Sequence, residues 1–511
     1  MTEKSSSPSA LISHQDLIYL SDFDLPFSPD PKIGKILVTG ASGYIGGRLV
    51  PQLLVRGYQV RALVRKASPE YNGLWPQAEV VAADVLDANP ELLEKALEGI
   101  DTAYYLLHSL NLGPKEFQAA DIQAAMNFRK AAENQKVHRI IYLGGLGDIR
   151  VSLSSHLRSR MEVAEELTKG KVPVTILRAA IIIGAGSASY EIVQHLVRKL
   201  YVIPIPRWAK SRCQPIAIRD VIKYLVGVLE VSGTDGKHFD IGGKEVLTYE
   251  EMLMILSRVL NLKRVFVAVP FSDTRVYAYF TSLLTPVPVS LTQCLMEGLK
   301  NDVVCLENGI KQYLPFEPIS YKEAVVRALT REEQDRVHTR WSDAYPPAHE
   351  LALKLRELKN RPAYSHFSSL LTKKSASSLF RSLCNVGGKE GWFQHNWMWR
   401  FRGLIDRVVG GVGTSRGRRS YTSLKINDVI DFWRIEDLRE NKTLLLRSEM
   451  KLPGRAWLEF GILESQGQRQ LSLMAYYDTK SLRGKLYWYA CLPFHYVIFK
   501  KLLMDIEARS L

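Results

Sequence analysis

Two short stretches carry residues whose types and spacing suit chemistry. The first, TGASGYIG at residues 39–46, spaces three glycines evenly after the apolar run KILV and at the start of a helical pattern. Gly40 permits a tight turn, Gly43 lets backbone N–H groups approach a pyrophosphate, and Gly46 lets helix and strand pack closely. The alternative is a glycine turn without a ligand. The residues expected to hold the phosphates are Gly40, Ser42, Gly43, Tyr44, Ile45 and Gly46.

The second stretch is SHLRSR at residues 155–160. His156 and Arg160 are one helical turn apart and therefore share a face. His156 suits a general acid because its ordinary pKa is near neutrality. Arg160 stays charged and suits a ribose or an oxyanion. The alternative is that His156 caps a helix or lies on the surface.

The coenzyme is indicated by the end of the second apolar run, ALVRKAS. A site for NAD(H) would place an acid there, whereas this chain has Arg65 and Lys66, which suit a 2′-phosphate. We therefore expect NADP(H) rather than NAD(H), with two ordinary surface residues as the alternative. Asp84 and Val85 follow the third run and are expected to meet the adenine.

The fourth run, DTAYYLLHSL, places Leu107, His108 and Ser109 at its carboxyl end. Ligands of parallel sheets bind at this edge, so these residues are expected to line the crevice, with His108 as a further catalytic candidate. A satisfied strand-end histidine is the alternative. Arg212 and Gln214 are candidates for a polar substrate contact or for a structural role.

The elements that must position these residues alternate from Gly34 onward. Short β-branched runs are separated by helical patterns near 46–56, 91–98, 116–133 and 156–168. This alternation predicts an α/β, doubly wound parallel sheet over residues 34–345. Its cap, about 231–345, is helical and is expected to be closed by the strand HFDIGG.

The last part of the chain changes character. Residues 361–511 hold strand-length runs, among them DVIDFWRIEDL, and turn signals at PG and QGQ. A helix is expected after the capping Ser375, and a long one from about Leu482. The pattern predicts an α+β domain whose antiparallel sheet grips that helix. Residues 346–360 are expected to be a helical linker, and residues 1–33 a polar tail.

Together these motifs resemble a known family. TGASGYIGG, the pair Asp84-Val85, AYYLLHSL and RIIYLGGLG resemble the atypical short-chain dehydrogenase/reductases, in the branch with NmrA-like and complex I accessory-subunit-like members. HLRSRMEV, RCQPIAIRDV, FDIGGKEVLTYEEM and GKEGWFQHNWMWRFRGLIDRVVGG resemble a bacterial two-domain family whose C-terminal domain has a START-like, helix-grip character and no known function.

The resemblance implies an architecture more firmly than an activity. The family's serine position falls near Gly144 or Gly145, and its YxxxK pair is replaced by His156 and Arg160. Three functions stay open. The chain is an NADP(H)-dependent oxidoreductase of an apolar carbonyl-type substrate, a non-catalytic redox sensor or assembly factor, or a lipid- or quinone-binding protein regulated by nucleotide.

The amino-acid composition limits the classes of partner that we expect. The formal net charge is +15 over 511 residues, but basic and acidic residues are interleaved and no nucleic-acid-binding motif is present, so nucleic acid is not expected. The five cysteines are far apart and predict neither a metal site nor a disulfide framework. With no export signal, we expect a cytoplasmic protein.

Aromatic residues crowd 392–401 and the final helix, where they either fill a core or line a cavity for an apolar ligand. The final helix also carries lysines and arginines, among them Lys485 and Lys500. It suits peripheral contact with an anionic inner membrane, or burial against its own sheet.

Overall fold

The structure is a computed structural model that describes residues 28–65, 71, 74–87, 89–108, 117–147, 154–271, 273–306, 309–333, 339–344, 354–358, 360–388, 390–393, 396–416, 418, 424–465 and 468–510. Most of the expected polar tail, Lys66 and Ser109 lie outside the described residues.

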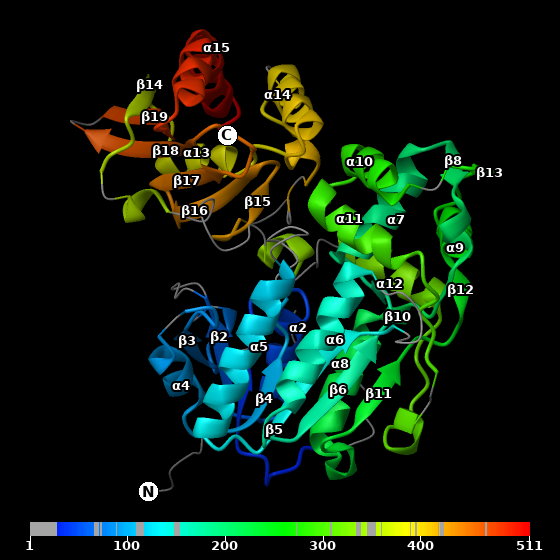
Figure 1. Cartoon of the computed structure of the whole chain (residues 1–511). Helices are drawn as coiled ribbons and strands as arrows, with labels where there is room; N and C mark the ends of the chain where they lie inside the picture. Colours follow the sequence, from blue (N-terminus) through cyan, green and yellow to red (C-terminus); the bar gives the residue numbers. More distant parts are fainter. Residues whose placement is uncertain are drawn as a thin grey trace, which may run out of the picture.

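A seven-stranded parallel sheet organises the first part of the chain, in the order β11-β6-β5-β4-β1-β2-β3 (Figure 1). This is the predicted doubly wound α/β fold. The inner strands are buried on both faces, as in the fully buried β2, which is why their sequences read as continuous apolar runs, whereas the edge strand β3 is partly exposed. Their bounds are β1 Lys35–Val38, β2 Val60–Val64, β3 Glu79–Ala82, β4 Ile100–Tyr105, β5 Arg139–Gly145, β6 Val174–Ala179 and β11 His238–Ile241.

Helices cover both faces of this sheet. One face packs against α4, α5 and α6, and the other against α2 and α8, which gives one apolar core on each side (Figure 1). These helices are α2 Gly46–Val55, α4 Glu91–Leu97, α5 Phe117–Asn134, α6 Ser155–Thr168 and α8 Ile218–Glu230.

One expectation about the sheet is wrong. The segment HFDIGG does not close the cap, because β11 pairs in parallel with β6 and forms the edge of the main sheet. Phe239 and Ile241 of β11 are buried in the core beneath that edge.

The cap is helical and lies beyond the carboxyl ends of the strands (Figure 1). It has its own apolar core and includes residues before 231. Its elements are β7 Ile182–Ile183, α7 Ala188–Lys199, β8 Val202–Ile205, β9 Arg212–Cys213, β10 Ile216–Ala217, β12 Leu247–Thr248, α9 Tyr249–Val259, β13 Val265–Ala268, α10 Thr274–Leu284, α11 Val289–Gly298 and α12 Tyr321–Glu333.

The C-terminal unit is a six-stranded antiparallel sheet, in the order β14-β19-β18-β17-β16-β15, with α15 packed against β14 and β19. Ser375 caps α13 and the last helix begins at Leu482, as predicted. The elements are β14 Tyr364–Thr372, α13 Ala376–Leu383, α14 Asn396–Val408, β15 Val429–Ile430, β16 Trp433–Arg439, β17 Thr443–Ser448, β18 Arg455–Ser465, β19 Gln468–Asp478 and α15 Leu482–Ala508.

Two details differ from the sequence-based expectation. DVIDFWRIEDL is not one strand, because Asp431 has φ +55° and turns the chain so that β15 pairs with β16. Of the expected helical linker, the structure describes residues 354–358 and 360, which contain a short 3-10 helix, Leu355–Glu357.

Candidate functional site

The glycine turn between β1 and α2 has the shape of a phosphate cradle. Gly40 has φ +62°, and a Cβ there would lie 3.0 Å from the carbonyl oxygen of Leu106. A Cβ on Gly46 would lie 2.3 Å from the carbonyl oxygen of Gly40. The Gly47 and Arg48 amides donate to the carbonyl oxygens of Gly43 and Ile45, both at 3.0 Å, which holds the turn tightly against the start of α2. The positive end of the α2 dipole there favours an anion such as a pyrophosphate. The turn that contains Ser42, Tyr44 and Ile45 therefore fits a dinucleotide.

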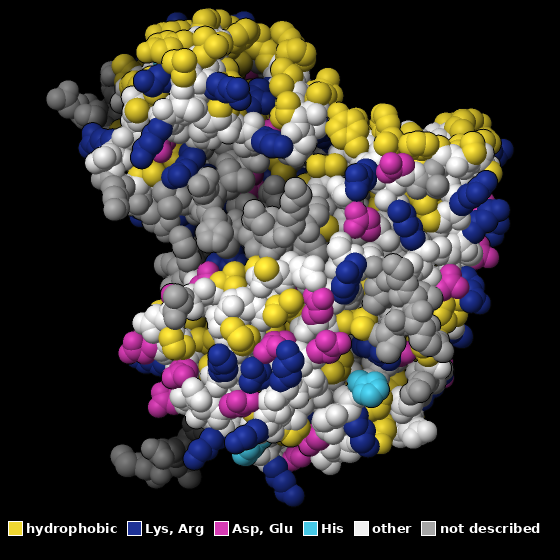
Figure 2. Space-filling view, viewed as in Figure 1, with side chains coloured by type: hydrophobic (Ala, Val, Ile, Leu, Met, Phe, Trp, Pro, Cys, Tyr) yellow, Lys and Arg dark blue, Asp and Glu magenta, His cyan; other side chains and the backbone are white. Residues whose placement is uncertain are grey.

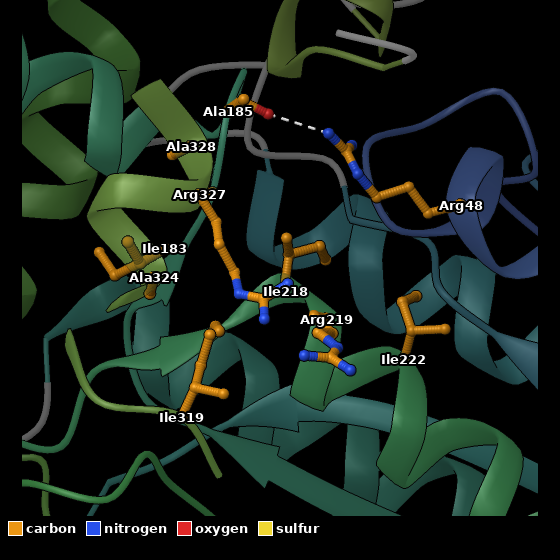
Figure 3. A pocket seen from close by; sticks show the side chains of 12 residues that line it. Arg48, Ile183, Ala185, Ile218, Arg219, Ile222, Ile319, Ala324, Arg327 and Ala328 are labelled. Atoms are coloured by element: carbon orange, nitrogen blue, oxygen red, sulfur yellow. Dashed lines mark hydrogen bonds between the residues drawn. The ribbon is translucent and has the colours of Figure 1, made fainter. Parts of the chain in front are cut away.

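A buried arginine fixes this turn from behind. The Arg48 guanidinium donates to the Ala185 carbonyl oxygen at 2.9 Å (Figure 3). It also donates to the Tyr44 carbonyl oxygen at 3.0 Å and lies over the Tyr44 ring. It also bonds Thr339. The neighbouring cavity, lined also by Arg219 and by apolar side chains, holds only about 40 Å³, room for one or two waters and not for a coenzyme.

The expected adenine end lies at the carboxyl ends of β2 and β3. The Arg65 side chain is 51% exposed, and its Nε is 3.8 Å from an Asp84 carboxylate oxygen. This separation makes a weak ion pair, so the guanidinium is not tightly held. The Val85 carbonyl oxygen accepts a hydrogen bond from Asn127 of α5 at 2.8 Å, a contact that sequence reasoning missed.

At the end of β4, three side chains form a hydrogen-bonded chain. An Asp121 carboxylate oxygen lies 2.9 Å from His108 Nδ1, and His108 Nε2 lies 3.1 Å from His156 Nδ1. The two imidazole rings are stacked. The structure thus brings together two histidines singled out in the sequence. Asp121, which nothing in the sequence analysis indicated, stands at the buried end of this proton chain.

One face of α6 holds the proton chain in place. Ser154 caps the helix, His156 lies in its first turn, and Ser159 donates to the Asp121 carboxylate at 3.1 Å. The Arg160 guanidinium donates to the carbonyl oxygens of Leu107 at 3.0 Å and Leu143 at 2.5 Å, so it joins the ends of β4 and β5. Binding of a ribose or an oxyanion by Arg160 stays a prediction.

Burial and nearby charge keep both imidazoles neutral at pH 7. Burial lowers the pKa of His108, the Arg160 guanidinium lowers it further, and the Asp121 carboxylate opposes both. Burial lowers the pKa of His156 well below its ordinary value, and His108 and Arg160 add to that effect. The first turn of a helix also disfavours a cation.

The tautomers follow from Asp121. An ionised carboxylate only accepts, so His108 donates through Nδ1 and accepts at Nε2 from His156 Nδ1. His156 Nε2 is then left with its lone pair. The three groups form a line rather than a ligand set, and among the residues that the structure describes no group of three metal-binding side chains is present.

Other candidate positions have structural partners. A Cβ on Gly145 would lie 3.1 Å from a Leu157 side chain, so a serine there would require that side chain to shift slightly. Arg212 pairs with Asp302 at 3.0 Å. Gln214 bonds the backbone of Gly243 at 2.7 Å, which supports the structural alternative for both residues.

An apolar cavity of about 370 Å³ lies in the cap among α7, β8, α9, α10 and α11. Met296 of α11 lines it. The next residue, Glu297, accepts a hydrogen bond at 3.2 Å from Ser155, the neighbour of His156. One helix therefore contacts both the cavity and the turn that carries the outer end of the proton chain.

Two family models match different parts of the chain. The model of the NmrA-like family matches residues 32–313. A second model, described as a protein of unknown function (DUF2867), matches residues 359–502 and gives this part no START-like identity.

Individual relatives match part of the chain. The mitochondrial NADH dehydrogenase (ubiquinone) 1 alpha subcomplex subunit 9 of Arabidopsis thaliana is 25% identical over 54% of this chain and 71% of its own length. A 3 beta-hydroxysteroid dehydrogenase/Delta 5→4-isomerase of Mycobacterium tuberculosis is 31% identical over 22% of this chain and 31% of its own. The structure of a Citrobacter triphenylmethane reductase complexed with NADP(H) aligns with a TM-score of 0.47 at 22% identity, over 57% of this chain and 99% of its own.

Proposed function

Since the chain belongs to the NmrA-like family, we propose that it is an oxidoreductase that uses NADP(H) on an unidentified apolar carbonyl-type substrate. The proton chain Asp121–His108–His156 is the observation that carries this proposal. The cradle that only glycine fits supports the coenzyme, and exposed Arg65 supports its 2′-phosphate. The apolar cavity beside α11 supports an apolar substrate.

A nicotinamide coenzyme, when bound, supplies or accepts a hydride. The side chains of the protein transfer the proton. When the Asp121–His108–His156 group takes up one extra proton, the proton rests on His108, beside Asp121. His108 Nε2 then donates to His156 Nδ1, and His156 carries its own proton on Nε2. As Nε2–H protonates a carbonyl oxygen, His156 takes a proton at Nδ1 from His108. In the reverse direction, His156 Nε2 accepts the proton of an alcohol.

The main alternative is a non-catalytic coenzyme-binding sensor or assembly factor. The glycines at positions 144 and 145, where the family's serine falls, favour it. So does the similarity, at 22% identity, to the photosystem II assembly factor Ycf39 of Trieres chinensis. A lipid- or quinone-binding protein regulated by nucleotide is a third candidate, for which the apolar cavity is the support.

A turnover assay distinguishes the proposed functions. We expect the full chain to oxidise NADPH with a member of a panel of apolar ketones, aldehydes and enones. We expect His156→Gln to lower kcat by about 10²–10³-fold with little change in NADPH affinity, because it removes proton transfer and leaves the glycine cradle intact.

His138→Gln is the matched control, because His138 lies in the same domain with 81% of its side chain exposed and should leave kcat unchanged. Unchanged turnover in His156→Gln would remove His156 from the mechanism. NADPH binding without turnover across the panel would favour the sensor.

A further inference from the structure

We propose that one face of the molecule, formed by the outer sides of α10, α14 and α15, docks on the surface of an anionic lipid bilayer. Figure 2 shows hydrophobic side chains gathered along this edge, over the helices that Figure 1 places there. The cap and the C-terminal unit both contribute to it. We call it the apolar face. Among the described residues no helix is long and apolar enough to cross a membrane, so the contact is peripheral.

Helix α14 turns its apolar stripe outward. Trp397, Phe401, Leu404 and Val408 follow helical spacing on one side, and each is more than half exposed. The opposite side carries the buried Trp399, Gly403 and Asp406. A helix that packed only against its own domain would bury the larger apolar stripe, so this orientation is typical of an interfacial helix.

Helix α15 has two apolar sides. Trp488, Phe499 and Leu503 pack into the core of the C-terminal unit, as one alternative for this helix predicts. On the outer side, Leu486 and Tyr489 belong to a second apolar stripe that is more than half exposed. The full set on that side is Leu482, Leu486, Tyr489, Phe494 and Tyr496.

Direct contacts hold α10 beside α14. The Arg407 guanidinium of α14 donates to the carbonyl oxygens of Leu283 and, at 3.3 Å, Thr285 at the end of α10. The Tyr279 hydroxyl donates to the Val408 carbonyl oxygen at 3.4 Å. Phe280 of α10 is 59% exposed and also lines the apolar cavity. The cavity therefore adjoins the apolar face.

The charges of the same helices favour a bilayer with anionic headgroups over another apolar partner. Of the three arginines of α14, Arg400 is exposed, whereas Arg402 donates to Tyr487 and Arg407 to the end of α10. The one acid of the helix, Asp406, is buried. Helix α15 carries exposed Lys485, Lys500 and Lys501 beside its outer stripe. Long basic side chains next to aromatic ones reach phosphate headgroups while their stems cover apolar surface.

Co-sedimentation with lipid vesicles tests the proposal on the full chain. We expect it to pellet with equimolar phosphatidylcholine and phosphatidylglycerol vesicles and far less with phosphatidylcholine alone. We expect Trp397→Ser/Phe401→Ser and Leu486→Ser/Tyr489→Ser each to weaken binding about tenfold or more, because each pair removes large apolar side chains from the contact.

Leu92→Ser, at a leucine on α4 that is also more than half exposed but lies outside the apolar face, is the control and should bind as the parent does. Circular dichroism and thermal unfolding establish that every variant is folded. The proposal is overturned if the parent fails to pellet with either vesicle. It is also overturned if the apolar-face variants bind vesicles normally, or if they change only the mass of the protein in solution, which would assign the face to a second copy of the chain.

Discussion

At the scale of single residues, Asp121 determines where protons lie along the chain to His156. Its carboxylate accepts from both His108 and Ser159, so it orients one ring and one helix face together. His156 is a competent base or acid only through that orientation, much as a buried aspartate orients the histidine of a hydrolase triad.

The pH dependence of turnover follows from the direction of the pKa shifts. Carbonyl reduction needs the extra proton on the pair of histidines, whose pKa values both lie below the ordinary value of about 6.5. Reduction should therefore accelerate as pH falls and level off only at a pH below about 6.5, whereas alcohol oxidation should be flat above that pH. Asp121→Asn should move the reduction profile to lower pH, because the carboxylate favours the protonated form of the histidines.

The measurement is kcat against pH for the parent chain and for Asp121→Asn in the reduction direction. His138→Gln again serves as the control. A rate that does not vary with pH, or a profile that Asp121→Asn leaves in place, would contradict the proposed role of the proton chain.

His156 and His108 could be singled out from the sequence because strand ends and helical spacing predict where they point. Asp121 could not be singled out, because the residues that it contacts, His108 after β4 and Ser159 of α6, are far from it in the sequence. A signal existed: Asp121 shares a helix face with the buried Ala125 and Phe128, where an acid is out of place without a partner. Ser159 was not singled out either, and its spacing of three residues from His156 was the signal that could have indicated it.

At the scale of elements, the close approach of α2 to β1 depends on one position. Gly46→Ala should destabilise the fold by about 1–3 kcal/mol, because its Cβ would press on backbone atoms that cannot move aside cheaply. It should also weaken NADPH binding. The measurement is denaturant unfolding together with coenzyme titration.

Gly309→Ala is a suitable control, because a Cβ there would meet nothing within 4 Å. Equal stability and equal coenzyme affinity in the Gly46→Ala and Gly309→Ala variants would show that the turn is not shaped as described.

The elements themselves were largely predictable. The parallel strands, α5 and α6 begin and end close to their expected positions, and α15 begins where expected, because apolar period and capping residues are local signals. The wrong expectations concern which strands pair with one another. Nothing local shows that β11 joins β6, or that Asp431 adopts φ +55° and splits one apolar run into two paired strands.

At the scale of the whole molecule, the apolar face depends on how the two parts of the chain are joined. Besides the contacts of Arg407, Arg434 of the C-terminal unit donates to the Ser342 carbonyl oxygen at 2.6 Å. Amphipathic patterns show that α14 and α15 each have an apolar stripe. They do not show which stripe is turned outward, because that depends on the sheet and core behind each helix.

Calorimetric titration of the full chain with NADPH and NADH tests the central claim, that the glycine turn holds a nicotinamide dinucleotide. Saturable binding of one NADPH per chain, tighter than that of NADH, is the predicted result. Arg65→Ala should remove most of the difference, because it removes a cation from the 2′-phosphate. A well-folded chain that gives no heat with either coenzyme, oxidised or reduced, would contradict the account.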